Sequence, residues 1–214
     1  MTNEGDKTFS ILFGNGNGTF RNQTTYPIFD GSASITTADF NNDKKLDLAV
    51  ANSMNDTVTV FFDNGDGTFQ NQTKYSVGYY ATSTTAGDFN NDTNVGLVVG
   101  TYNGDAVYVL LGRGDGTFSN SISYSSGAHP SFVLSADMNN DGNVDLIAAN
   151  SDGANTVTLL FGNGNGAFAN KTMYTTGLFP TSVAADAFRD KTKLDLVVTS
   201  ALDNSISFFF NSCP

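Results

Sequence analysis

A single motif recurs four times along this chain and restricts the folds that it can adopt. Each copy is a run of apolar and β-branched residues, then a turn rich in Gly and Asn, then a phenylalanine. The copies end at Phe20, Phe69, Phe118 and Phe168, so their spacing is 49, 49 and 50 residues. A tyrosine follows each phenylalanine by six residues, at Tyr26, Tyr75, Tyr124 and Tyr174. A fixed period of this size is typical of proteins built from repeated structural units.

Each unit reads as four short β-strands. In the first complete unit we expect strands at 34–40, 46–53, 57–63 and 68–77, because these runs are rich in β-branched and aromatic residues and are bounded by Asn, Asp and Gly. No stretch keeps a helical period over three turns. Four antiparallel strands repeated every 40 to 50 residues predict an all-β fold, a β-propeller of four-stranded blades. We expect one domain over 1–214, with units at 1–31 (partial), 32–80, 81–129, 130–179 and 180–214 (partial).

The first and last units are incomplete, which bears on how a ring would close. The chain begins with a third-strand motif and stops after another one. We therefore expect four blades, with the N-terminal segment 19–28 serving as the outer strand of the fourth. One copy of the third strand is then redundant, and an unpaired edge strand invites self-association. The alternative is a fragment of a larger ring.

An acidic turn separates the first two strands of three units, at 39–47, 88–96 and 137–145. Carboxylates crowded into so short a segment repel one another unless a cation or solvent screens them. Calcium takes six to eight oxygen ligands, and alternate positions of a tight loop can converge on one ion. The candidate ligands, with backbone carbonyls supplied by Lys45, Asn94 and Asn143, are Asp39, Asn41, Asp43, Lys45 and Asp47; Asp88, Asn90, Asp92 and Asn94; and Asp137, Asn139, Asp141, Asn143 and Asp145. The alternative is an Asx-rich turn that binds no metal.

Two units depart from this pattern. Gly96 replaces the closing carboxylate of the second turn, so we expect two intact calcium sites and one weakened site. In the fourth unit only Asp195 keeps its place, while Arg189 and Lys191 stand at ligand positions. We expect Arg189 or Lys191 to supply a positive charge there and to pair with Asp195. In the third turn, Gly142 permits the positive φ that a sharp turn requires.

The combined pattern DFNNDxxxDLxVA and VxVLLGxGDGTF resembles the FG-GAP/VCBS repeats of integrin α-chain heads and of many secreted adhesins and lectins. The resemblance covers nearly the whole chain. It implies a β-propeller in which the acidic turn joins the first two strands of a blade and binds calcium. It also implies ligand binding by the loops around the channel.

The linkers between units vary although the units around them are alike. They carry the aromatic residues Phe29, Tyr79, Tyr80, His129 and Phe179, which would suit a carbohydrate or protein ligand. The alternative is that these rings fill the junctions between blades. The tripeptide Arg113–Asp115 reads Arg-Gly-Asp, but it occupies the ordinary Gly-rich turn of the repeat.

Charge and composition argue against several classes of function. A net charge of −11 argues against nucleic-acid partners, which require Lys and Arg. No apolar run is long enough for a membrane span, and the first residues show no signal peptide, so we expect a soluble chain. One His and one Cys offer no catalytic triad. We therefore expect a non-enzymatic, calcium-stabilised binding or adhesion module, extracellular or at the cell surface. The alternatives are a passive spacer in an adhesin and a propeller-type hydrolase.

Overall fold

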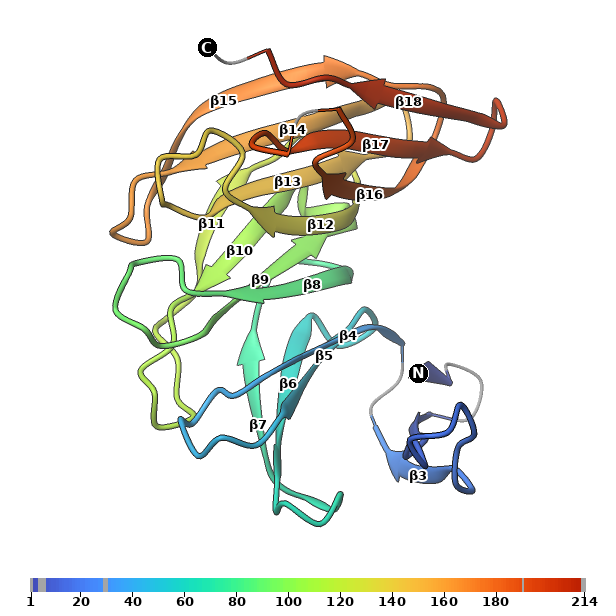
Figure 1. Ribbon diagram of the computed structural model, residues 1–214, viewed down its shortest axis with the longest axis vertical. Helices are drawn as coiled ribbons and strands as arrows, with labels where there is room; N and C mark the ends of the chain where they lie inside the picture. The colour runs from blue at the N-terminus through green and yellow to red at the C-terminus, as the bar shows by residue number, and fades with distance from the viewer. Residues whose placement is uncertain (1, 4–6, 29–30, 190, 213–214) are drawn as a thin grey trace.

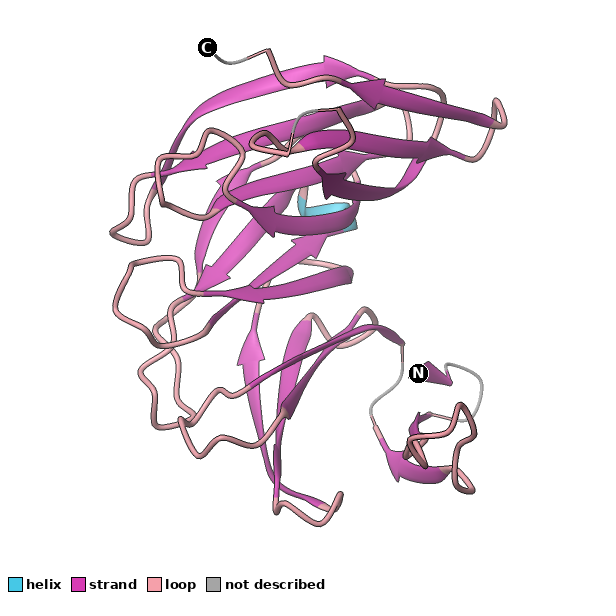
Figure 2. Cartoon of the chain, viewed as in Figure 1, coloured by secondary structure: helices cyan, strands magenta, loops and turns pink. Residues whose placement is uncertain are grey.

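The computed structural model describes residues 2–3, 7–28, 31–189 and 191–212. These residues form antiparallel β-sheets joined by turns and loops, and one short 3-10 turn at Tyr102–Gly104 is the helical segment described among them (Figure 2). The all-β prediction is confirmed. No helix in the described part of the chain is long and apolar enough to cross a membrane.

The three complete units each form a four-stranded antiparallel sheet whose strands follow sequence order, as predicted (Figure 1). Turns and loops of 4 to 11 residues join neighbouring strands in each of these sheets. The strands are β4 (Ser32–Ala38), β5 (Asp47–Asn52), β6 (Thr57–Asp63) and β7 (Phe69–Ser76); β8 (Ala81–Gly87), β9 (Gly96–Thr101), β10 (Ala106–Leu110) and β11 (Ile122–Ser125); and β12 (Pro130–Ala136), β13 (Asp145–Asn150), β14 (Thr156–Gly162) and β15 (Phe168–Thr175).

The two terminal sheets have three strands each and do not merge. The first contains β1 (Thr2–Asn3), β2 (Thr8–Ile11) and β3 (Thr24–Pro27), and the last contains β16 (Pro180–Asp186), β17 (Asp195–Ser200) and β18 (Ser205–Phe209). They lie at opposite ends of the array of sheets (Figure 1). The sheets are therefore not closed into a ring in this structure.

The prediction that segment 19–28 completes the fourth blade is wrong. Strand β3 pairs with β2, with Tyr26 opposite Phe9, rather than with β18. The physical reason is competition: β2 and β18 are the same strand of the repeat, and β3 pairs with the copy that precedes it along the chain. Strand β18, which was expected to pair with segment 19–28, is instead left at the edge of its sheet among the described strands.

The first strands of successive units lie against one another. Strand β4 contacts β8, β8 contacts β12, and β12 contacts β16. Small hydroxyl side chains join them: the backbone N–H of Val133 donates to Ser83 Oγ at 3.1 Å, and the Thr85 and Ser135 hydroxyls lie 3.0 Å apart. Short polar side chains let these strands approach closely, which explains their Ser- and Thr-rich sequence.

Apolar residues fill the space between adjacent sheets. Strands β5, β9 and β13 are buried along their whole length because neighbouring sheets cover both of their faces. Between the first two complete units, for example, Val58 and Val60 pack with Leu97, Val99 and Leu110. Residues at alternate positions of a strand face opposite sides of the sheet, so both sets must be apolar here.

The repeated phenylalanine and tyrosine form an interlock between units. Phe118, after the Gly-rich turn of one unit, lies with its ring centroid 5.1 Å from Tyr75 and 5.6 Å from Phe40 of the preceding unit. The Tyr75 hydroxyl donates to the Gly116 carbonyl of the same turn at 3.4 Å. The contact recurs as Phe69 on Tyr26 (5.5 Å) and Phe168 on Tyr124 (5.4 Å). The six-residue spacing thus reflects packing between blades.

Candidate functional site

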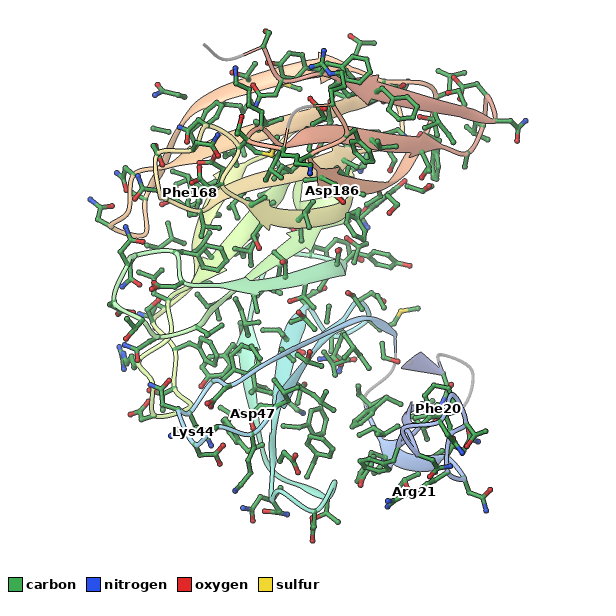
Figure 3. The ribbon with its side chains drawn as sticks, viewed as in Figure 1. Phe20, Arg21, Lys44, Asp47, Phe168 and Asp186 are labelled. Carbon is green, nitrogen blue, oxygen red and sulfur yellow. The ribbon has the colours of Figure 1, made fainter. Side chains whose placement is uncertain are left out.

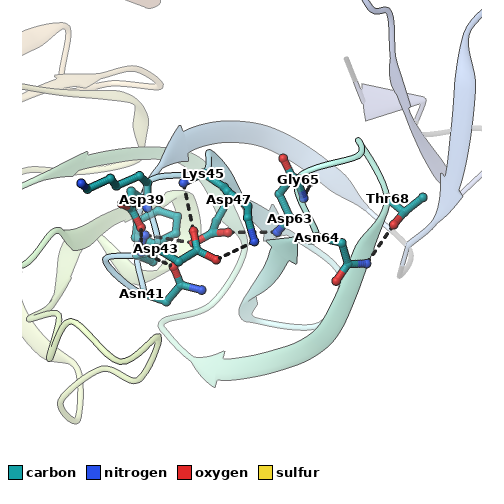
Figure 4. A network of polar contacts seen from close by, with 11 residues as sticks. Asp39, Asn41, Asp43, Lys45, Asp47, Asp63, Asn64, Gly65 and Thr68 are labelled. Atoms are coloured by element: carbon teal, nitrogen blue, oxygen red, sulfur yellow. Dashed lines mark hydrogen bonds and ion pairs between the residues drawn. The ribbon is translucent and has the colours of Figure 1, made fainter.

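The acidic turns lie where they were predicted, between the first and second strands of each complete unit. In the first turn the backbone N–H of Asp43 donates to both Asp39 Oδ1 and Asn41 Oδ1, each at 3.1 Å, so these two oxygens converge (Figure 4). Lys44 N–H donates to Asp39 Oδ2 at 2.7 Å. The third turn repeats the arrangement with Asp137, Asn139 and Asp141. Side chains at alternate positions therefore line one side of the turn.

The sharp turn requires two residues with positive φ. One of these two positions is occupied by Lys44 (67°) in the first turn, Thr93 (70°) in the second and Gly142 (84°) in the third. The expected role of Gly142 is confirmed. A β-branched residue such as Thr93 rarely adopts this conformation, so the turn enforces it. The turn geometry is preserved even where the sequence does not favour it.

The closing aspartates Asp47 and Asp145 are fully buried and serve as backbone acceptors. Asp145 accepts from Met138 N–H at 2.8 Å and from Gly162 N–H at 2.9 Å, which ties the turn to the end of β14. Burial raises the pKa of both carboxyls, and the neighbouring aspartates of each turn raise it further. Each complete turn therefore buries a carboxylate beside others of the same charge.

The donor set suits a hard cation, since Ca²⁺ prefers carboxylate, amide and carbonyl oxygens. Among the described residues, however, no three Asp, Glu, His or Cys side chains come together closely enough to hold a metal ion. The carboxylates of the turns instead accept hydrogen bonds from backbone N–H groups. Calcium binding at the residues named above thus stays a prediction.

The fourth turn contains the predicted ion pair. Arg189 Nη2 lies 3.3 Å from Asp195 Oδ1, and its guanidinium also stacks 4.0 Å from the centroid of the Phe210 ring. Arg189 is thus the residue that supplies the positive charge. Its hydrogen bond lowers the pKa of Asp195, whereas the equivalent Asp47 and Asp145, which have no such partner, have raised pKa values.

Side-chain amides link successive acidic turns. Asn42 Nδ2 donates to Asn94 Oδ1, and Asn91 Nδ2 donates to Asn143 Oδ1, each at 2.9 Å. Gly114 lies directly over the first of these pairs, where a Cβ atom would collide with both amides. The Arg-Gly-Asp tripeptide is therefore held in the packed Gly-rich turn, as the repeat alone predicts.

The aromatic linker residues lie at the opposite ends of the strands, beside the loops that join second to third strands. Tyr80 and His129 take equivalent positions, and their backbone N–H groups donate to Asp56 and Asp105 of those loops, both at 2.9 Å. Tyr79 is exposed. Phe179 sits in the next linker, and its N–H donates to Asn155. Phe29 lies outside the described residues.

Tyr102, which the sequence reasoning missed, brings two of these residues together. Its ring stacks on His129 at 4.7 Å and lies 6.1 Å from Tyr80. His129 Nδ1 is 2.9 Å from the Tyr102 carbonyl oxygen and 3.6 Å from Asp105 Oδ1. We call Tyr80, Tyr102 and His129 the aromatic loop cluster. The sequence did contain a signal for this residue: Tyr102 is aromatic, whereas the other units have the small residues Ser53, Ser151 and Ala201 at the same position.

Comparison with known sequences identifies the repeats. The FG-GAP-like repeat matches four overlapping segments, residues 2–50, 39–99, 88–148 and 137–198. This chain belongs to the FG-GAP-like repeat family. The expected resemblance is thus confirmed over nearly the whole sequence. No curated protein matches it.

Solved structures share the fold of this FG-GAP-like protein at low identity. They include an Agrocybe aegerita lectin that recognises non-reducing terminal N-acetylglucosamine (20% identity, TM-score 0.54, 80% of this chain and 47% of the lectin). A protein of unknown function from Desulfotomaculum acetoxidans gives 13% identity and a TM-score of 0.66, over 95% of this chain and 62% of that one. BBS1N, solved in complex with ARL6DN, gives 16% identity and a TM-score of 0.59, over 97% of this chain and 63% of that one. The FG-GAP-like chain spans about half to just under two thirds of these proteins.

Proposed function

We propose that this FG-GAP-like protein is a non-catalytic binding module whose aromatic loop cluster contacts a carbohydrate ligand. The observation that carries the proposal is the backbone of the linkers. Tyr80 (φ 62°), His129 (55°) and Phe179 (60°) all adopt the left-handed conformation, while the equivalent residue of the first linker is Gly31 (77°).

Bulky residues rarely occupy this conformation, because it costs roughly 1–2 kcal/mol for any residue with a Cβ atom. Glycine would relieve that cost, and Gly31 shows that the repeat accepts it. Three aromatic side chains retained at strained positions support a role beyond folding, since strain of this kind clusters at functional sites.

The chemistry of the cluster suits a sugar ring. The stacked Tyr102 and His129 rings offer an apolar face, and Asp105 and Asp152 offer acceptors beside them; the Tyr102 hydroxyl reaches Asp152 Oδ2 at 3.5 Å. Aromatic rings with one polar end are the usual contact groups of such recognition surfaces. A protein ligand is the second candidate, and the exposed Tyr79 would extend the surface toward it.

A glycan array probed with the whole chain tests this proposal, with non-reducing terminal N-acetylglucosamine among the probes because a fold neighbour recognises it. We expect binding to at least one glycan class, and at least ten-fold weaker binding for Tyr102→Ala. Tyr174→Ala, which removes an exposed tyrosine outside the loops, is the matched control and should bind normally. Equal binding by Tyr102→Ala and the wild type would refute the proposed site.

Two glycine variants separate recognition from folding. Phe179→Gly and His129→Gly should keep or raise the melting temperature, because glycine removes the left-handed strain. His129→Gly should nevertheless weaken glycan binding, since it removes the ring stacked on Tyr102. A large loss of thermal stability in both variants would mean that these rings serve mainly to fill the blade junctions.

We also propose that Ca²⁺ is a structural cofactor of the first and third acidic turns, held more weakly by the second and excluded from the fourth. The residues of this chain would supply carboxylate and carbonyl oxygens, and the ion would offset the repulsion among them. Arg189 supports this reading, because the one turn that lost its carboxylates carries a fixed cation against its closing aspartate. Extracellular calcium is millimolar, so the proposal fits a secreted or surface location.

Thermal unfolding with millimolar calcium and with excess chelator tests the metal. Stability should rise with free calcium as RT ln(1 + [Ca²⁺]/Kd), and the rise should vanish in Asp39→Ala/Asp137→Ala. Asp66→Ala/Asp115→Ala, which removes two aspartates from Gly-rich turns, is the control and should keep the calcium response. An unchanged melting temperature for the wild type would leave these segments as hydrogen-bonded turns without a metal.

Two further functions remain alternatives to a binding module. A passive spacer would bind no glycan or protein probe while keeping the calcium response. A propeller-type hydrolase would turn over a substrate in a hydrolase panel. The loop cluster disfavours the spacer, because a spacer has no need of strained aromatic residues.

A further inference from the structure

Each junction between neighbouring sheets uses the same apolar positions of the repeat. One unit offers a forward face, which in the first complete unit consists of Phe40, Val58 and Val60. The next unit covers it with a backward face, which there includes Leu110 and Phe118. All five side chains are buried. The forward and backward faces are thus complementary wherever two units meet.

The forward face of the last unit is uncovered. Its equivalent residues are Phe188, Ile206 and Phe208, and each is half or more exposed. In the preceding unit the same positions are buried; they are Met138, Val157 and Leu159. The Phe188 and Phe208 rings contact each other at 6.3 Å, and Phe208 also lines an apolar hollow beside the sheet. Ile206 and Phe208 are two residues apart on β18 and so face the same side of the sheet.

The backward face of the first sheet is uncovered as well. Leu12 and Phe20 take the places of Leu110 and Phe118, and they are 43% and 63% exposed. Figure 3 shows Phe20 on the first sheet, at the far end of the molecule from the last sheet. The two ends of the array thus carry the two halves of an interface that the chain otherwise makes internally.

We propose that copies of this chain associate head to tail, with Leu12 and Phe20 of one copy covering Phe188, Ile206 and Phe208 of the next. The contact would use the same positions of the repeat that meet in an internal junction, so apolar side chains would face apolar side chains. The last sheet has no outer strand among its described strands, so it offers no tyrosine equivalent to Tyr75 on which Phe20 of the other copy could pack. The contact is therefore weaker than an internal junction. A heterologous interface of this kind builds open chains of copies unless a rotation closes them.

Sedimentation of the 214-residue chain from micromolar to millimolar concentration tests the proposal. The wild type should grow beyond a dimer as concentration rises, at an ionic strength that screens its net charge of −11. Phe20→Lys and Phe208→Lys should each stay monomeric in that range, because burying one large apolar side chain changes an association constant by roughly ten-fold to a hundred-fold. Both side chains are exposed in the single chain, so the melting temperature of either variant at low concentration should not change.

Mixing the two variants gives the decisive result. Each keeps one intact face, so an equimolar mixture should form a one-to-one dimer and nothing larger. Leu202→Lys, which replaces an exposed leucine in the turn before β18, is the control and should associate like the wild type. A monomeric wild type at all concentrations would overturn the proposal. Association of Phe20→Lys alone would overturn it too, because the contact would then be between two C-terminal faces.

Discussion

The closing aspartate of the third acidic turn offers a direct test of how the turn is held. Asp145 is fully buried, and its two oxygens accept the N–H groups of Met138 at 2.8 Å and Gly162 at 2.9 Å. Asp145→Ala leaves both donors buried without an acceptor. Each such donor costs about 1–3 kcal/mol, so the variant should lose about 2–6 kcal/mol. Because the substitution also removes a charge whose burial is unfavourable, the loss in the free energy of unfolding should lie toward the lower end of that range.

Asp145→Asn is the matched comparison, because its amide keeps one acceptor oxygen and carries no charge. We expect it to lose about 1–3 kcal/mol, between the wild type and the alanine variant. Urea unfolding in excess chelator is the assay, with the slope m compared among the three proteins so that a change in midpoint reports stability. An alanine variant within about 0.5 kcal/mol of the wild type would refute the view that this carboxylate clamps the turn to β14.

Three other perturbations have expected outcomes. In chelator, the melting temperature should rise as pH falls from neutral toward about 4, because burial raises the pKa of Asp47 and Asp145 and the folded state favours their protonated forms. The double variant Asp47→Asn/Asp145→Asn should flatten this pH dependence, and a wild-type melting temperature that falls over the same interval would contradict the prediction. Gly114→Ala should lower the free energy of unfolding by more than Gly153→Ala does. Both glycines have positive φ, but a Cβ atom added at Gly114 meets two asparagine amides, whereas one added at Gly153 meets open space. Equal losses would show that backbone strain alone matters. Arg189→Ala should lower the melting temperature at neutral pH, and the loss should shrink only as pH falls below about 4 and through the lowered pKa of Asp195, where the carboxylate partner becomes protonated. An effect independent of pH would point to lost packing on the aromatic ring instead.

Much of the fold followed from the sequence, because each unit is specified by local signals at fixed spacing. Gly and Asn mark the turns, β-branched runs mark the strands, and the repeat of these features gives four-stranded sheets in sequence order. The Arg189–Asp195 pair could be predicted for the same reason: the alignment of four units showed which charge was missing and which had taken its place.

Closure of the array was decided by tertiary structure. Strands β2 and β18 carry the same motif, so sequence alone gave segment 19–28 two possible partners, and pairing with β2 prevails because it is the nearer strand along the chain. The aromatic loop cluster likewise arises only when the end of β9 meets the linker before its unit and the linker after it, which places Tyr102 between Tyr80 and His129.

The sequence by itself determined the strands, the turns and the order of the sheets, since these depend on residues a few positions apart. Tertiary structure alone decided which apolar faces stay uncovered. Phe20 and Phe208 resemble buried residues of other units in every local respect, yet both are exposed. The reason is that burial depends on a neighbouring sheet, and no property of a single unit specifies whether that neighbour is present.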